Sequence, residues 1–288
     1  MLIENKKQIE SNSAKDYIFG RCIGGDSYSL VYLAIDRHSG LEYAIKVFEK
    51  RLVRQEQQEN TISRQCEAMW IMRNVPGFLQ LRQTFQDQRS LYLVMQHARR
   101  GNLQGYISSF DGAACRHYAA EILVACEQLH QRQLIHGELK LQTVLLDEQL
   151  HIMLAEFGAA QKAELTAATD LRALGCIIYE MVAGWPAEQI NLHDLPKDAQ
   201  QLLKLLLNAP TKFVSYEQLR SEAFFTGIDW QTLRQQIPPL IYAQSSSSEF
   251  NASMQSLPNS EDLELALEQQ PINCLPKAQP AHASCSIC

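Results

Sequence analysis

Three parts of the chain carry residues whose chemistry suits a phosphate group. The turn from Gly24 to Ser27 contains glycines, which would let backbone N–H groups approach an anion closely. Lys46 offers a cation, and Glu138 and Glu156 offer carboxylates that can accept a proton or bind a metal ion. Asp26 counts against this chemistry, because its side chain obstructs the turn and its charge repels a phosphate. An ordinary polar hairpin turn is the alternative interpretation, and we prefer it.

The elements around these residues begin with a small mixed unit. Residues 16–52 alternate between polar and apolar types, are rich in β-branched and aromatic residues, and are interrupted by glycine turns. This pattern predicts three antiparallel strands. A polar, glutamine-rich helix over residues 55–72 and two strands near residues 79–85 and 91–95 follow. These elements predict a small α+β lobe.

The rest of the chain is predominantly helical. From Cys115 onward the apolar residues recur at helical spacing. Residues 144–146 and 151–154 read as a short hairpin. Residues 170–183 are apolar nearly all round, as in a helix buried within a larger lobe, and residues 199–208 predict a further helix.

Composition is typical of a soluble globular protein. The chain has 288 residues, of which 46% are hydrophobic and 20% charged, and its formal net charge is −6. Nothing in this balance indicates a nucleic-acid partner. The eight cysteines have the spacing of neither a zinc site nor a disulfide framework. We expect a reducing, cytoplasmic environment, with no signal peptide and no apolar run long enough to cross a bilayer.

Four motifs, taken in order, resemble the signature of the protein kinases. They are Ala44-Ile45-Lys46, the segment from His136 to Thr143, Glu156-Phe157-Gly158, and the segment from Asp170 to Gly175. This order is highly specific for the fold. The resemblance therefore implies an α+β, bilobal kinase fold with ATP and Mg²⁺ as the family's cofactors.

Other segments resemble one branch of the family more closely. They are residues 43–51, 84–87, 173–179 and 235–239, which are similar to the phosphoinositide-dependent protein kinases of the AGC group. The similarity covers about residues 16–243 and implies a role in signal transduction.

The resemblance divides the chain into four parts. Residues 1–15 form a polar extension, residues 16–98 the small lobe and hinge, and residues 99–243 a shortened large lobe. Residues 244–288 are rich in serine and proline and predict a disordered tail, in which a short helix near residues 259–267 is plausible.

The resemblance also assigns residues to the adenine end of a nucleotide site. Met95 takes the gatekeeper position and the following residues the hinge, while apolar side chains supply contact with the base. The nucleotide-binding positions are Ile23, Gly24, Val31, Ala44, Lys46, Met95, Gln96 and Ala98.

The catalytic positions depart from the family's pattern. Glu138 replaces the catalytic aspartate, which displaces the reacting oxygen by one methylene, and a shift of about 1 Å can cost on the order of a hundredfold in rate. Lys140 is retained. At the metal positions, Thr143 replaces an asparagine and Glu156 an aspartate. Gln65 stands in place of the helix glutamate that pairs with Lys46. We expect weak or absent ATP binding, and any binding should not depend on Mg²⁺.

Two segments of the large lobe are also short. Only residues 159–169 separate the Glu156-Phe157-Gly158 motif from Asp170, which leaves no room for a full activation segment and peptide platform. The segment between Gly184 and Leu202 is short as well, so we expect helix G to be missing.

In the family, a groove on the small lobe accepts the aromatic C-terminal tail of other AGC kinases. The residues that align with this groove are Lys50, Val53, Ile62, Gln86, Leu91 and Leu93. The alternative is that the apolar ones are simply lobe core. Separately, Cys285-Ser286-Ile287-Cys288 resembles a prenylation box, and membrane association would depend on a lipid at Cys285. We prefer an unmodified tail, because no basic run lies upstream.

Three interpretations of function remain open. The one that we favour is a pseudokinase, meaning a protein-binding, scaffolding or decoy module in AGC-kinase signalling. The second is a weakly active serine/threonine kinase that uses Glu138 and Glu156. The third is a decayed paralogue without a function. Fold alone does not decide among them.

Overall fold

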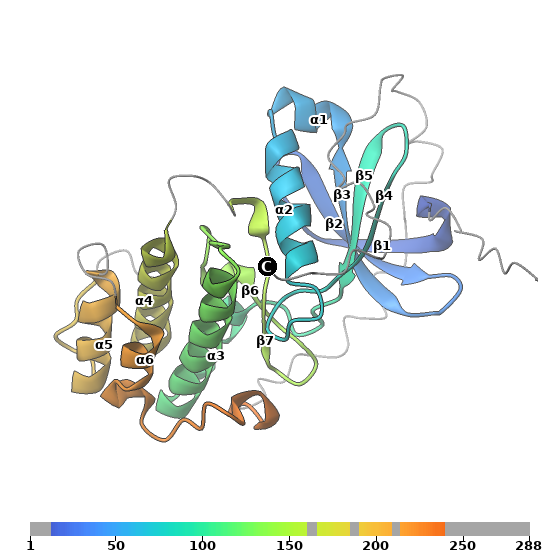
Figure 1. Ribbon diagram of the computed structural model, residues 1–288. Helices are drawn as coiled ribbons and strands as arrows, with labels where there is room; N and C mark the ends of the chain where they lie inside the picture. The colour runs from blue at the N-terminus through green and yellow to red at the C-terminus, as the bar shows by residue number, and fades with distance from the viewer. Residues whose placement is uncertain (1–12, 160–165, 185–189, 209–213, 240–288) are drawn as a thin grey trace, which may run out of the picture.

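The computed structural model describes residues 13–159, 166–184, 190–208 and 214–239. Figure 1 shows two lobes: a sheet with two helices, and a larger lobe built almost entirely of helices. This is the α+β, bilobal architecture that the sequence predicts.

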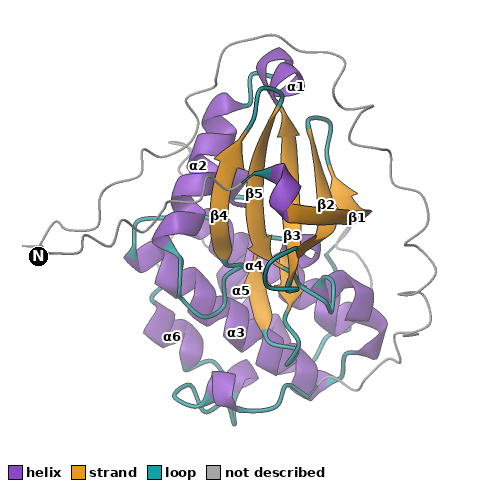
Figure 2. Ribbon diagram, turned by 90° about the vertical axis from the view of Figure 1, so that its right-hand side faces the viewer, coloured by secondary structure: helices purple, strands orange, loops and turns teal. Residues whose placement is uncertain are grey.

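The small lobe is built on one five-stranded antiparallel sheet. Its strands are β1 (Tyr17–Gly25), β2 (Ser29–Asp36), β3 (Glu42–Glu49), β4 (Leu81–Gln86) and β5 (Ser90–Gln96). They lie in the order β1-β2-β3-β5-β4 (Figure 2). The three predicted strands of residues 16–52 are confirmed, and so are the two later ones, with slightly shifted ends.

The predicted helix over residues 55–72 corresponds to α2 (Glu59–Ile71), and a short helix that was not predicted, α1 (Lys50–Gln55), precedes it. They are separated at Gln57, whose φ of 53° lies in the left-handed region and cannot continue a right-handed helix. The apolar positions of α2, with Ile62, Cys66 and Met69 fully buried, lie against the sheet (Figure 1).

The large lobe packs around two long helices. α3 (Gly112–Gln131) starts at Asp111, whose side chain accepts a hydrogen bond from the N–H of Ala114. α4 (Ala167–Ala183) starts three residues before the predicted position. Its last turn ends at Gly184, which takes the left-handed conformation typical of a helix C-terminus.

Shorter elements complete this lobe. The hairpin of β6 (Val144–Leu146) and β7 (Ile152–Leu154) confirms the prediction. α5 (Lys197–Leu207) packs on α4, and α6 (Tyr216–Arg220), which the sequence did not reveal, packs on α3. The described residues between α4 and α5, which are 184 and 190–196, form no helix; the expectation that helix G is missing also concerns residues 185–189, which lie outside the described residues.

Several expectations fall outside the described residues. They concern most of the polar N-terminal extension, the middle of the short segment before α4, and the tail with its helix near residues 259–267 and Cys285. Within the described residues, no helix is both long and apolar enough to cross a bilayer.

Candidate functional site

The register of the sheet gathers the predicted nucleotide-binding residues on one face. Val31 lies directly opposite Lys46, and Ala44 lies directly opposite Met95. Lys46 and Ala44 are two residues apart on β3, so their side chains point to the same face. Gly24 pairs with Val31 on the next strand. Sequence spacing and strand pairing therefore agree for this part of the site.

The remaining predicted positions lie at the rim of that face. Gln96 and Gly24 are exposed, and Ala98 is half-buried. Ile23 is 38% exposed, so it is available to cover an apolar ligand. Met95 and Ala44 are buried and form the floor. This face therefore carries apolar side chains at the predicted adenine positions, and the adenine site itself stays a prediction.

Lys46 is buried at the opposite end, and two carboxylates of the same chain face it. Its Nζ lies 2.9 Å from Oε2 of Glu156 and 3.6 Å from Oδ2 of Asp26. Among the described residues, no hydrogen bond joins Gln65, which replaces the usual partner, to Lys46. The cation is therefore neutralised from within by residues of the glycine turn and of the Glu156-Phe157-Gly158 motif.

Asp26 has two roles in its turn. Its Oδ1 accepts a hydrogen bond from the N–H of Tyr28 at 3.1 Å, and its own N–H donates to the carbonyl of Ser29 at 2.8 Å. These bonds close a polar hairpin turn, as the preferred interpretation requires. The second carboxylate oxygen remains directed at Lys46, so the turn also carries negative charge to the place where a phosphate would need a cation.

Tyr28 lies beneath this turn and stacks on Phe48, with ring centroids 6.3 Å apart. Burial raises the pKa of Tyr28, and the negative charges of Asp26, Glu156 and Glu138 raise it further. The sequence did not single out Tyr28, because its position in the turn does not show which way the ring points.

The catalytic-loop carboxylate is engaged with its neighbour. Oε1 of Glu138 lies 3.1 Å from Nζ of Lys140, and both side chains are about half exposed. Thr143 is buried, and its hydroxyl donates to the backbone carbonyls of Glu138 and Lys140 while accepting from the N–H of Lys140. Thr143 therefore closes the loop rather than presenting a ligand.

A fully buried carboxylate holds this loop in place. Asp170, on α4, accepts hydrogen bonds from the N–H groups of His136 at 2.7 Å and Gly137 at 2.8 Å. Nε2 of His130 donates to the same carboxylate at 2.9 Å. Three hydrogen bonds to one charged acceptor hold the start of the catalytic loop firmly against α4.

His136 fixes the loop from the other side. It is completely buried; its Nε2 donates to the carbonyl of Ala155 at 2.8 Å, and its Nδ1 accepts from the N–H of Glu138 at 3.3 Å. This pairing defines a neutral ring, and burial lowers the pKa of His136. The ring also packs against Phe157, 5.1 Å away between centroids.

At the phosphate end, the side chains at the predicted ATP and Mg²⁺ positions are engaged with other groups of the chain. Of the two predicted metal positions, Glu156 is paired with Lys46 and Thr143 is turned into its own loop. Asp26 adds a further negative charge beside Lys46. We derive no step of phosphoryl transfer through this arrangement, although the described part of the catalytic loop is well ordered by its hydrogen bonds to Asp170 and His136.

The predicted docking groove is closed in this structure. Val53, Ile62, Leu91 and Leu93 are all fully buried, which is the arrangement of lobe core. Lys50 is also buried, and its Nζ donates a hydrogen bond to the carbonyl of Asp87, while Gln86 is exposed. Because Leu91 is fully buried, a Leu91→Glu variant would lose stability whether or not the groove binds a peptide. The groove is therefore tested by changing the peptide and leaving the protein unchanged.

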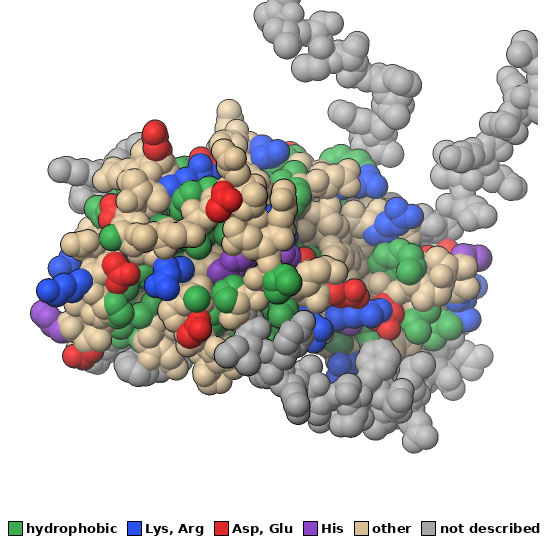
Figure 3. Space-filling view, turned by 90° about the horizontal axis from the view of Figure 1, so that it is seen from below, with side chains coloured by type: hydrophobic (Ala, Val, Ile, Leu, Met, Phe, Trp, Pro, Cys, Tyr) green, Lys and Arg blue, Asp and Glu red, His purple; other side chains and the backbone are tan. Residues whose placement is uncertain are grey.

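Charge is mixed over the surface of the large lobe. Seen from below in Figure 3, Lys and Arg side chains lie interspersed with Asp and Glu side chains. This agrees with the small net charge of −6. The visible face therefore offers no broad field of one sign.

Comparison with known proteins identifies the family to which this fold and these motifs belong. Residues 17–170 match the family model described as "Protein kinase domain". The human and rat proteins named "3-phosphoinositide-dependent protein kinase 1" are each 32% identical over 282 residues, covering 80% of this chain and 50% of the relative. "Serine/threonine-protein kinase ppk21" of Schizosaccharomyces pombe is 30% identical over 298 residues, covering 85% of this chain and 54% of the relative.

The chain thus spans about half the length of these curated relatives. The matched residues include the glycine turn, Lys46, the catalytic loop and the bracing Asp170. On its motifs, its fold and these similarities, the chain belongs to the protein kinase family and is similar to the 3-phosphoinositide-dependent protein kinases.

Proposed function

We propose that this chain is a pseudokinase: a protein-binding module with the kinase fold, acting in AGC-kinase signalling with little or no phosphoryl transfer. The observation that carries the proposal is the pairing of Lys46 with Glu156 and Asp26. These carboxylates are paired with Lys46, the cation that nucleotide phosphates need. A nucleotide has to displace both of them, and it meets their negative charge when it does.

The catalytic loop supports the same conclusion. Glu138 forms an ion pair with Lys140, and Thr143 has used its hydroxyl within the loop. Positioning and electrostatic stabilisation are nearly all that phosphoryl transfer asks of a protein. Here the groups that would supply them bind one another.

Phosphoryl transfer is tested with labelled ATP and a panel of generic AGC-kinase peptide substrates. We expect no incorporation above that of a Lys46→Ala variant, because the transfer site lacks a free cation and metal ligands. Incorporation by the wild-type chain that disappears in Lys46→Ala would overturn the proposal.

Nucleotide binding is tested by calorimetry with ATP, in the presence and absence of Mg²⁺. We expect wild-type binding to be weak and unaffected by Mg²⁺. Asp26→Gly should strengthen binding several-fold, since it removes one carboxylate 3.6 Å from Lys46 and restores a glycine to the turn. The matched control is Glu49→Gln, which removes one exposed negative charge from the same sheet and should leave binding unchanged. Tight, Mg²⁺-dependent binding by the wild type would contradict the mechanism.

A weakly active serine/threonine kinase is the second candidate, because the names of the relatives describe them as protein kinases. In that case Glu138 would act as the base and Glu156 as the metal ligand. Both side chains are partly exposed, so each is accessible. A Glu138→Gln variant separates the candidates: it abolishes a genuine activity and leaves background incorporation unchanged.

For a partner, we propose the aromatic C-terminal tail of an AGC kinase, held at the small lobe. The exposed Gln86 and the α1–α2 turn border this region. Because the apolar side chains beneath are buried, binding requires that α1 or α2 moves to expose them. The test is a fluorescence titration with a tail peptide, matched by the same peptide with its aromatic residues replaced by alanine. No saturable binding, or equal binding of both peptides, would leave this region as lobe core.

A further inference from the structure

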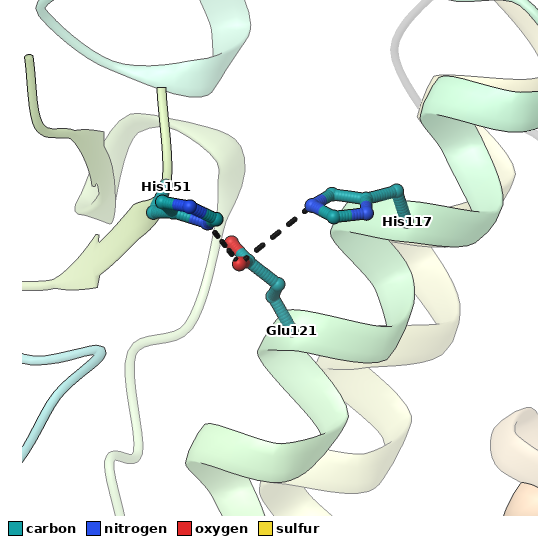
Figure 4. Close-up of side chains that lie close together, drawn as sticks. All are labelled: His117, Glu121 and His151. Carbon is teal, nitrogen blue, oxygen red and sulfur yellow. Dashed lines mark hydrogen bonds and ion pairs between the residues drawn. The ribbon is translucent and has the colours of Figure 1, made fainter. Parts of the chain in front are cut away.

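A buried group of three metal-ligating side chains lies in the large lobe, away from the phosphate site. His117 and Glu121 are one turn apart on α3, and His151 lies just before β7 (Figure 4). They are 3%, 2% and 9% exposed, respectively. Figure 4 shows both imidazole rings directed at the Glu121 carboxylate from two different elements.

The carboxylate is oriented by the backbone of β7. Oε2 of Glu121 accepts a hydrogen bond from the N–H of Ile152 at 2.9 Å. Its other oxygen, Oε1, lies 2.5 Å from Nδ1 of His151 and 3.7 Å from Nε2 of His117. The three ligand atoms all lie within 4.8 Å of one another. The support of a ligand by a hydrogen bond on its far side is typical of metal sites.

His117 is the incomplete member of the group. Its Nε2 is buried, and within the described residues it has no hydrogen-bond partner, because 3.7 Å to Glu121 is too long. Buried polar atoms are nearly always paired, and leaving one unpaired costs free energy. A simple hydrogen-bonded core cluster would satisfy both histidines, whereas this arrangement satisfies only His151. What is missing is a group that binds a ring nitrogen and a carboxylate at once.

We propose that His117, Glu121 and His151 form a binding site for Zn²⁺. Two imidazoles and a carboxylate are a ligand set that Zn²⁺ accepts, whereas Mg²⁺ and Ca²⁺ prefer oxygen alone. Tetrahedral Zn²⁺ with bonds near 2.0–2.1 Å holds its ligand atoms about 3.3 Å apart. The present separations of 2.5 and 3.7 Å bracket that value, so shifts below about 1 Å in the side chains suffice.

A cavity of about 210 Å³ borders the Glu121 side of this site. Glu121, Gln128 and Arg234 contribute to its wall, whereas the two histidines do not. Within the described residues, the side-chain oxygen of Gln128 is likewise buried without a hydrogen-bond partner. The cavity is large enough for water, which would complete the coordination of the metal as a fourth ligand.

Arg234 is the main opposing feature. Its Nη1 lies 3.9 Å from Oε1 of Glu121, and the guanidinium also reaches Asp147 and the carbonyl of Ile152. Its positive charge disfavours a dication at Glu121 by Coulomb repulsion. The affinity of the site for Zn²⁺ is therefore set by competition with Arg234. Bound Zn²⁺ would join α3, which carries His117 and Glu121, to His151 just before β7.

The test is a titration of the full chain with Zn²⁺ alone, in competition with a chromogenic chelator. Thermal unfolding is followed in parallel, with Mg²⁺ as a comparison ion. We expect one Zn²⁺ at this site and a rise in unfolding temperature with Zn²⁺ but not with Mg²⁺. His117→Gln should weaken this binding at least tenfold, and His38→Gln, which changes an exposed histidine, should not. Arg234→Gln should tighten binding several-fold, a result that a merely structural role of the cluster would not produce.

Binding of Zn²⁺ to cysteine thiolates is the competing outcome, and Co²⁺ distinguishes it. Co²⁺ at the proposed site should give a spectrum without a thiolate-to-metal band, because no cysteine contributes. The unfolding temperature of metal-free His117→Gln shows whether the variant folds. The proposal is overturned by absence of Zn²⁺ binding in the wild type, by binding that survives His117→Gln unchanged, or by a thiolate band from the only bound ion.

Discussion

Replacement of Asp170 by alanine tests how the catalytic loop is held. The carboxylate is completely buried and accepts three hydrogen bonds, two of them from the consecutive N–H groups of His136 and Gly137. Alanine leaves both N–H groups and His130 without this acceptor. Each unpaired buried donor costs about 1–3 kcal/mol. The terms overlap because the donors share one carboxylate, so we expect a total loss of about 3–5 kcal/mol.

This loss is measured by urea unfolding and by thermal unfolding. For a domain of this size, 1 kcal/mol corresponds to a change of about 2–4 °C in the melting temperature, so Asp170→Ala should melt about 6–20 °C lower. The matched control is Glu67→Ala, which removes an exposed carboxylate from the middle of α2. It should change stability by no more than about 0.5 kcal/mol. A loss below about 1 kcal/mol for Asp170→Ala would refute the bracing role.

Three further predictions concern stability and reactivity. Because burial lowers the pKa of His136, its contribution to stability is complete above the unfolded-state pKa of about 6.5 and is lost as pH falls below it. Urea titrations should show a decline of up to about 1.4 kcal/mol per pH unit there, and a His136→Phe variant should show a shallower slope. Among the described cysteines, a limiting maleimide should label exposed Cys22 first and buried Cys66 only after unfolding, as read by mass spectrometry. Gly184→Ala should cost about 1 kcal/mol in urea unfolding, since Gly184 ends α4 with φ of 79°.

The main elements of the fold were predictable because local pattern and tertiary structure agree. Alternation with glycine turns gave the strands, and apolar helical spacing gave α3 and α4. The break at Gln57 was not predictable, since glutamine is a good helix former and carries no turn signal. α6 is only five residues long, too short for a periodic pattern to appear.

The residues of the candidate site were predictable from the sequence, but the ion pairs between them were not. The sequence identifies Asp26, Lys46 and Glu156 as altered or retained phosphate-site residues. It cannot show that Lys46 pairs with a carboxylate 110 positions away, because that contact depends on how the lobes close on each other. The His117–Glu121 spacing was a local signal for one helix face. His151, 30 residues beyond Glu121, joins them only through the position of β7.

The distribution of intact and altered contacts also bears on the decayed-paralogue alternative. Buried polar groups that only support the catalytic loop have kept their partners: Asp170 has three donors, and His136 uses both ring nitrogens. The altered residues have not been left without partners either, since Glu156 and Asp26 meet Lys46, and Glu138 meets Lys140. Lys46 is the buried charge in this set, and leaving it unpaired would cost several kcal/mol against a total stability of about 5–15 kcal/mol. Under the proposed pseudokinase function, the pairing of Glu156, Asp26 and Glu138 with lysines fits selection for a stable kinase fold better than decay does.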